Sequence, residues 1–211
     1  MSETSSLQDA PSLVPEDQAR ANVYGLLARL FYAPPDSQLL GQLLNATRGN
    51  GGDEHAEGDT GALDQAWREV LNASRTAFPA MLEAEHTALF VGTGKSEVTP
   101  YLSHYVMRHG SDTPLSELRG ALLRLGIERR VGVPEYEDHV SCVFETMAYL
   151  IAVQRRSLEE QKAFFERFVY TSASKFCTAV TASAHATFYP LVAKYALQFL
   201  EVEHKAFSMV G

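Results

Sequence analysis

Three acids and a histidine stand together at residues 135–139, within the stretch VPEYEDHVSCVFETMAYL (residues 133–150) and directly before its strongly apolar part. Carboxylates beside a histidine can perform acid–base catalysis, bind metal ions or pair with basic ligands. The same residues also suit a helix start: Pro134 fits the first turn, acids there complement the helix dipole, and Asp138 can cap backbone N–H groups. The residue types alone therefore leave two interpretations open, a capped helix start and a recognition surface.

His139 falls at the edge of the apolar stripe that follows it, neither in the deep core nor fully outside. A histidine in that position can meet a neighbouring loop or a partner molecule. We expect the adjacent Asp138 to favour the charged form of the imidazole.

Two Glu-x-x-His pairs offer a different chemistry, metal binding, at Glu83/His86 and Glu201/His204. Residues three apart share a helix face, and di-iron bundles combine two such pairs with a Glu from each of two other helices. Glu145 is one candidate for such an acid, but its helical position lies away from the neighbouring apolar stripe. We interpret both pairs as residues of solvated helix faces, and a metal-binding helical-bundle enzyme remains the alternative function.

Apolar residues recur with a helical period along most of the chain. The clearest pattern follows the acidic cluster and comprises Val140, Val143, Phe144, Met147, Leu150 and Ile151. Helices are predicted at residues 16–33, 36–46, 62–78, 81–91, 114–125, from the acidic cluster to 151, 158–184 and 186–205. No alternating strand pattern is present, so we predict an all-α fold, a single-domain bundle of about seven or eight helices.

Composition limits the function and the compartment. Residues 1–15 are rich in Ser, Pro and acid, which predicts a mobile N-terminal tail before a helical domain at residues 16–211. The net charge of −8 argues against nucleic-acid binding and favours a cationic or apolar partner.

Cys142 and Cys177 lie in helical patterns and are expected to be free thiols. The N-terminus lacks the pattern of a signal peptide, and no run approaches the ~18 apolar residues of a membrane span. We therefore expect a cytoplasmic protein.

Three segments, in this order, resemble the TorD/DmsD/NarJ family of molybdoenzyme maturation chaperones. They are Glu85-x-x-x-Leu89-Phe90, then Pro100-Tyr101-x-Ser103-x-Tyr105, then Pro134-Glu135-x-x-Asp138-His139 with the helix that follows. The resemblance extends over about residues 16–205, and its order, spacing and helical setting agree with the family.

The resemblance implies a chaperone and not an enzyme, without a cofactor or metal of its own. Its partner would be the apo catalytic subunit of a molybdopterin oxidoreductase, bound through the N-terminal twin-arginine signal peptide. Binding would assist cofactor insertion and delay export, with no nucleic acid or stable membrane insertion, by a monomer or homodimer. The family's signal-peptide surface corresponds here to Tyr101, Ser103, Tyr105, Pro134, Glu135, Asp138 and His139. Phe90 and the stripe at Val143, Phe144 and Met147 are expected to support it.

A twin-arginine peptide has a basic pair followed by an apolar stretch. Its recognition requires an apolar groove with carboxylates at one end, because carboxylates bind arginine bidentately. We expect Glu135, Glu137 and Asp138 to supply these carboxylates and the tyrosines to form walls of the groove.

Overall fold

The computed structural model describes residues 13–49, 61–92, 96–106, 113–129, 132 and 134–210, and leaves the side chains of 46–49 undescribed. Most of the predicted tail therefore lies outside the described residues. The elements are α1 Pro15–Tyr32, α2 Ser37–Gly49, α3 Ala62–Thr76, α4 Pro79–His86, η1 Thr87–Val91, η2 Leu102–Tyr105, α5 Pro114–Arg124, α6 Val140–Ala152, α7 Leu158–Phe164, η3 Phe165–Val169, α8 Tyr170–Thr181 and α9 Tyr189–Ser208.

The π-helical segment η1 continues α4, and the π-helical segment η3 joins α7 to α8 without a break. Counted as continuous helices, the described residues form eight, together with the short 3₁₀ helix η2. No strand occurs among these residues, and the only bridge is an isolated pair, Tyr101 with His139. The predicted single all-α domain is confirmed.

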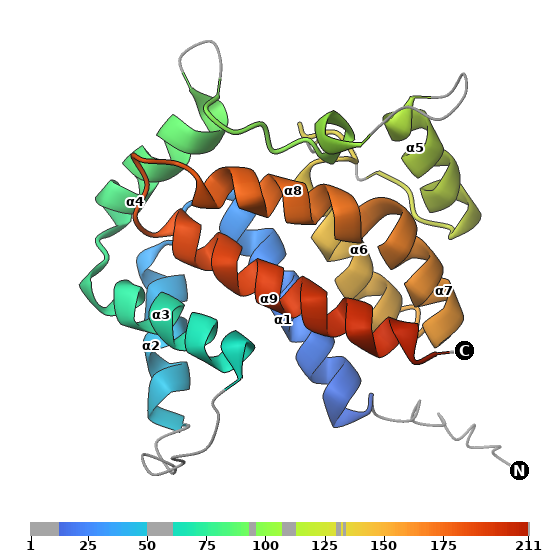
Figure 1. Cartoon of the computed structure of the whole chain (residues 1–211), viewed down its shortest axis with the longest axis horizontal. Helices are drawn as coiled ribbons and strands as arrows, with labels where there is room; N and C mark the ends of the chain where they lie inside the picture. The colour runs from blue at the N-terminus through green and yellow to red at the C-terminus, as the bar shows by residue number, and fades with distance from the viewer. Residues whose placement is uncertain are drawn as a thin grey trace, which may run out of the picture.

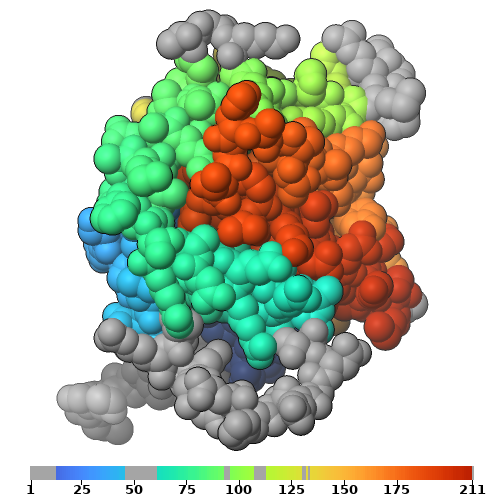
Figure 2. Space-filling view, turned by 60° about the vertical axis from the view of Figure 1, so that its left-hand side comes forward, coloured from blue at the N-terminus to red at the C-terminus, as the bar shows by residue number. Residues whose placement is uncertain are grey.

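The core lies where α1 and α6 run side by side and α8 and α9 pack against them (Figure 1). Aromatic rings fill it: Phe31 of α1 lies 5.1 Å from Phe176 of α8, centroid to centroid, and 6.3 Å from Phe144 of α6. Figure 2 shows α3 and α4, in turquoise and green, beside the orange and red surface of α8 and α9. Val143, Phe144 and Met147 are buried, as the apolar stripe predicts.

Proline and glycine set several helix ends. Pro15, Pro79, Pro114 and Pro190 each lie in the first turn of a helix, where the N–H that proline lacks would have no partner. Gly126 follows α5 with a φ of 69°, a conformation that strains a residue with a side chain. Helix α5 ends at Arg124, one residue before the predicted end at residue 125.

Glu85 connects α4 to the start of α9. Its Oε1 accepts the backbone N–H groups of Phe188 (2.9 Å) and Tyr189 (2.8 Å), and its Oε2 accepts the hydroxyl of Thr187 (3.1 Å). A carboxylate there satisfies N–H groups that a helix start leaves without partners. The first of the three motif segments thus fixes one helix against another.

A buried ion pair connects α1 to the other end of α9. Arg20 donates from Nε and Nη2 to the two oxygens of Glu203, at 2.8 and 2.9 Å, and from Nη1 to Asp17 at 2.9 Å. The hydroxyl of the buried Tyr24 donates to the same Glu203 carboxylate at 3.0 Å. The Glu203 side chain is only 3% exposed, so this network is part of the core.

None of the described helices has the length and apolar character that a membrane span requires.

Candidate functional site

The second and third motif segments meet in one backbone junction. The N–H of Leu102 donates to the carbonyl of Asp138 at 2.8 Å, and the N–H of Val140 donates to the carbonyl of Pro100 at 2.9 Å. These bonds form the antiparallel bridge between Tyr101 and His139. We call the residues around it the junction: Tyr101, Ser103, Glu135, Asp138 and His139. It joins predicted site residues that lie more than thirty positions apart in the sequence.

Asp138 is the buried centre of the junction, with 4% of its surface exposed. Its Oδ2 accepts a short hydrogen bond from the hydroxyl of Ser103 and a longer one, 3.4 Å, from the Ser103 backbone N–H. Its other oxygen, Oδ1, is buried and has no hydrogen-bond partner among the described residues. A carboxylate oxygen in that state can accept a further hydrogen bond from a ligand.

The predicted helix start at Pro134 is wrong, because α6 begins at Val140. The N-cap residue is His139, whose Nδ1 accepts the backbone N–H of Ser141 at 3.2 Å. Residues 134–139 turn back instead to pair with residues 100–102, which directs the Asp138 carboxylate to Ser103 and away from the helix end. The cap predicted at Asp138 is therefore also wrong.

His139 is buried rather than at an edge, with 5% of its surface exposed. Its ring lies edge-on to Tyr101 at 5.5 Å and to Tyr32 at 6.4 Å. Burial lowers the pKa of the imidazole, and this outweighs the opposite effects of Glu135 and Asp138. Asp138 thus acts in the predicted direction, but the cost of desolvating the charge exceeds the gain from the two acidic neighbours, so the net effect is a lowered pKa.

His139 and His86 make stability depend on pH, since burial lowers the pKa of His86 as well. A histidine with a lowered folded-state pKa binds protons more readily when unfolded, so acidification favours unfolding. We expect the free energy of unfolding to fall between about pH 7 and pH 5, by up to about 1.4 kcal/mol per pH unit for each histidine. Urea titrations across this range measure the slope.

The His139→Gln variant should show a shallower slope, and His104→Gln serves as the control because His104 is exposed. An equal slope in wild type and His139→Gln would contradict the assignment to His139. The range from about pH 5 to pH 7 lies above the ordinary pKa values of carboxylates, so acidic side chains contribute little to the slope of stability against pH.

The remaining predicted carboxylates also have partners within the chain. Tyr101 donates its hydroxyl to Glu135 at 2.5 Å, and burial together with this bond raises the pKa of Tyr101. Arg119 donates from Nε and Nη2 to Glu137 at 3.0 and 2.9 Å. Partial burial acts to raise the pKa of Glu137, but the hydrogen bonds and the charge of Arg119 bring it below its usual value. A basic ligand must therefore compete with these internal contacts.

The last two predicted site residues, Tyr105 and Pro134, differ in how far they are buried. Tyr105 is half-buried and donates its hydroxyl to the carbonyl of Thr99 at 2.9 Å, while its ring lies 6.1 Å from Phe176. Pro134 is exposed, and its carbonyl accepts a hydrogen bond from Arg129 at 3.2 Å. Tyr105 thus anchors the η2 turn on α8, whereas Pro134 is accessible at the surface.

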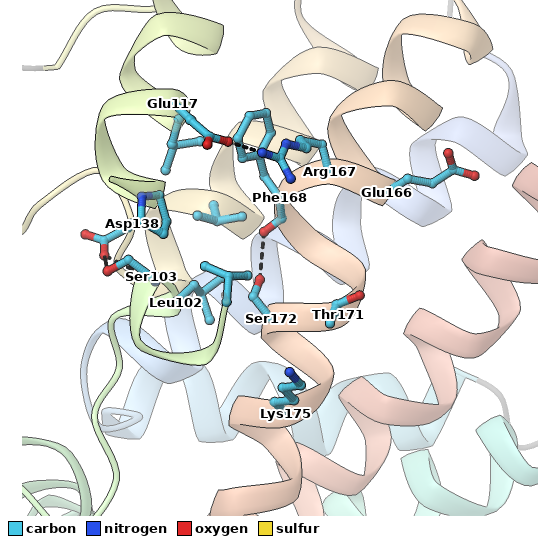
Figure 3. Close-up of a pocket in the computed structure, with 14 residues that line it drawn as sticks. Leu102, Ser103, Glu117, Asp138, Glu166, Arg167, Phe168, Thr171, Ser172 and Lys175 are labelled. Atoms are coloured by element: carbon cyan, nitrogen blue, oxygen red, sulfur yellow. Dashed lines mark hydrogen bonds and ion pairs between the residues drawn. The ribbon is translucent and has the colours of Figure 1, made fainter. Parts of the chain in front are cut away.

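A cavity of about 270 Å³ opens beside the junction, between η2, α5 and the η3–α8 helix (Figure 3). Ser103 and Asp138 line it from the junction, and Leu118 lines it from α5. Glu117 of α5 and Arg167 of η3 form an ion pair among the lining residues. The sequence analysis missed these charged residues, because they lie on helices that carry none of the three motif segments.

The two Glu-x-x-His pairs do not form a metal site. His86 is buried with its ring 5.1 Å from Phe90, whereas Glu83 is exposed, so the predicted solvated position of His86 is wrong. Glu201 accepts the hydroxyl of Tyr170 at 2.7 Å, and His204 stacks on that tyrosine at 4.0 Å. Across the described residues, no group of three His, Cys, Asp or Glu side chains could hold a metal ion.

Comparison with known proteins defines the class. Residues 55–178 match the family of the nitrate reductase delta subunit. The chaperone protein TorD of Photobacterium profundum is 32% identical over 102 residues, which cover 46% of this chain and 47% of that protein, about half of each. TorD of Colwellia psychrerythraea is 23% identical, with 94% of this chain and 95% of that protein covered. TorD of Shewanella loihica is 27% identical, with 85% and 89% covered.

A crystal structure from Archaeoglobus fulgidus, described as a redox enzyme maturation protein, has the same fold. Its TM-score is 0.54 at 16% identity, and the match covers 93% of this chain and 99% of that one. The family match and the relatives define the class as that of molybdoenzyme maturation chaperones, which are not catalysts. The chain belongs to the nitrate reductase delta subunit family, which includes TorD and NarJ, and the predicted family is confirmed.

Proposed function

We propose that this chaperone acts in the cytoplasm on the apo catalytic subunit of a molybdenum-cofactor oxidoreductase. It binds the N-terminal twin-arginine signal peptide of that client, keeps the client available for cofactor insertion and delays its export. The observation that carries the proposal is the junction itself. It brings the second and third motif segments together beside a cavity, which Ser103 and Asp138 line.

Burial divides the seven predicted binding residues into two roles. The exposed or half-buried ones supply the contact surface, namely Pro134, Glu135, Tyr101, Ser103 and Tyr105. The buried Asp138 and His139 hold the two segments of that surface together. Apolar cavity walls such as Leu118 suit the apolar stretch of a signal peptide, and the junction carboxylates suit its arginines.

Binding of the client's N-terminal peptide to the full chain, measured by calorimetry, tests this proposal. We expect Glu135→Lys to weaken binding about tenfold, because it places a like charge where the peptide is basic. Glu83→Lys is the matched control, since Glu83 is an exposed glutamate on α4 away from the junction. Absence of binding by the wild type, together with normal cofactor loading of the client in a strain lacking the chaperone, would contradict the proposal.

A further inference from the structure

Helix α5 has hollows along both of its sides. The cavity beside the junction borders its N-terminal half, and a hollow of about 530 Å³, which we call the α7 hollow, lies between α5 and the helix formed by α7 and η3. A third, of about 320 Å³, lies between the end of α5 and the outer face of α6. The three side chains that α5 buries, Leu118, Ala121 and Leu122, each line one of these hollows.

These hollows leave α5 loosely packed. A side chain that borders a void loses van der Waals contacts on that side. No described helix packs along α5 as closely as α6 packs along α1. The attachment of α5 therefore depends strongly on a few polar contacts at its two ends.

The C-terminal end of α5 is fixed to the loop that follows α6. The carbonyl of Leu125 accepts Nε2 of Gln154 at 2.9 Å and Nη2 of Arg156 at 3.2 Å. Nε of Arg156 also donates to Oε1 of Gln154 at 2.8 Å, so the two donors support each other. Gly126 follows with a φ of 69°, and a glycine can absorb a change in backbone direction at little cost. This end of α5 can therefore act as a pivot.

Two ion pairs at the protein surface hold the N-terminal half of α5. Glu117 pairs with Arg167 of η3, and Arg119 pairs with Glu137 in the segment before α6. Both arginine side chains are 47% exposed. Exposed ion pairs stabilise a contact only weakly, because water and salt screen them. The N-terminal half is thus held by contacts that break more easily than those at the pivot.

The ion pair between Glu117 and Arg167 also stands between two of the hollows. Both residues, together with Phe168, line the cavity beside the junction as well as the α7 hollow. Figure 3 shows the pair connecting α5 with η3. The cavity alone, at about 270 Å³, is smaller than the roughly 300–1,000 Å³ of most ligand sites. Separation of the pair would join it to the α7 hollow and make room for a larger ligand.

We propose that α5 is a lid over the cavity beside the junction. The lid pivots at its C-terminal end, near Leu125 and Gly126, and the two ion pairs hold it closed. Opening joins the cavity to the α7 hollow and admits the apolar stretch of the client peptide. The inference rests on the proposed function and adds control of access by a helix outside the three motif segments. Because only open molecules bind, the closed lid lowers the apparent affinity for the client.

Amide hydrogen exchange of the full chain, read for each helix by mass spectrometry, tests whether α5 opens independently. An isolated helix of 11 residues is marginal in water, so the amides of α5 exchange when it detaches. We expect them to exchange at least about tenfold faster than those of α1 in the wild type. The double variant Arg167→Gln/Glu137→Gln breaks both ion pairs and leaves the sequence of α5 unchanged. It should speed exchange in α5 about five- to tenfold and leave α1 unchanged.

Glu69→Gln is the matched control, because it breaks a surface ion pair between α3 and α9, to Lys194, and leaves α5 untouched. Exchange in α5 should then equal that of the wild type. Equal exchange rates of α5 and α1 in the wild type would mean that α5 opens only when the whole protein unfolds, and would overturn the lid. An exchange rate of α5 that the double variant does not raise would also overturn it.

Calorimetry with the client's N-terminal peptide tests whether the lid controls access. Arg167→Gln should bind the peptide several-fold more tightly than the wild type, because it lowers the cost of opening. Arg124→Gln is the control for charge, since Arg124 is an exposed arginine of α5 outside both ion pairs, and it should bind nearly as the wild type does. Equal affinities of wild type and Arg167→Gln, or an equal gain in both variants, would overturn control by the lid. If the wild type does not bind the peptide, the proposed function fails, and the exchange rates still decide whether α5 is a lid.

Discussion

Replacement of Glu203 by alanine is expected to lower the free energy of unfolding by about 3–5 kcal/mol, as is usual when one partner of a buried ion pair is removed. The loss leaves the Arg20 guanidinium and the Tyr24 hydroxyl without their shared acceptor. Burial acts to lower the pKa of Arg20, but the carboxylate raises it overall, while burial and the carboxylate both raise the pKa of Tyr24. Urea denaturation at neutral pH measures the change.

Two further variants define what the Glu203 result means. Glu201→Ala, two positions earlier in α9, should change stability little, because Glu201 is exposed. Combining Arg20→Met with Glu203→Leu should recover the part of the loss that comes from the unpaired arginine, because well-packed apolar residues often replace a buried ion pair without cost. The buried Tyr24 hydroxyl still loses its acceptor in this variant, so that part of the loss should remain. A loss below about 1 kcal/mol for Glu203→Ala would mean that the pair behaves like one on the surface.

The helices could be predicted from the sequence because each buries one face, and burial of one face leaves a periodic apolar pattern. The stripe at Val143, Phe144 and Met147 is such a case, and all three residues are in the core. The start of α6 could not be predicted, because Pro134 and the acids after it carry ordinary helix-start signals. The backbone bonds that residues 100–102 make with residues 138–140 decide the conformation there, and local propensity contains no information about them.

The candidate site, too, could be predicted only in part from the sequence. Ser103 and Asp138 could be selected by resemblance, but the hydrogen bond between them joins positions 35 apart and is set by the fold. Glu117 and Arg167, beside the cavity, come from two further elements whose sequences carry no site signal. The predicted solvated position of His86 is wrong because its i+3 spacing from Glu83 indicates a shared face, whereas the structure directs its ring inward against Phe90.

The second large effect is expected at Asp138. Asp138→Ala should lower the free energy of unfolding by about 2–3 kcal/mol, because it leaves the half-buried Ser103 hydroxyl without its carboxylate acceptor. This exceeds the roughly 1 kcal/mol expected for loss of a helix cap, and α6 should keep its cap at His139. Ser103→Ala and the double variant Asp138→Ala/Ser103→Ala complete a double-mutant cycle. Its coupling energy measures the interaction between the two side chains. Additive losses would show that the two side chains do not interact.

The Asp138→Asn variant then tests whether the Asp138 side chain supports the structure of the site or contacts the client directly. Asparagine keeps the size of the side chain and an oxygen that can accept from Ser103, but it removes the charge. If Asp138 only holds the junction together, peptide affinity should fall in step with stability across Asp138→Asn, Asp138→Ala and Ser103→Ala. If its unpaired Oδ1 meets an arginine of the client, Asp138→Asn should lose affinity while remaining nearly as stable as the wild type. We expect the first pattern, because Asp138 is only 4% exposed and its carboxylate already accepts from Ser103.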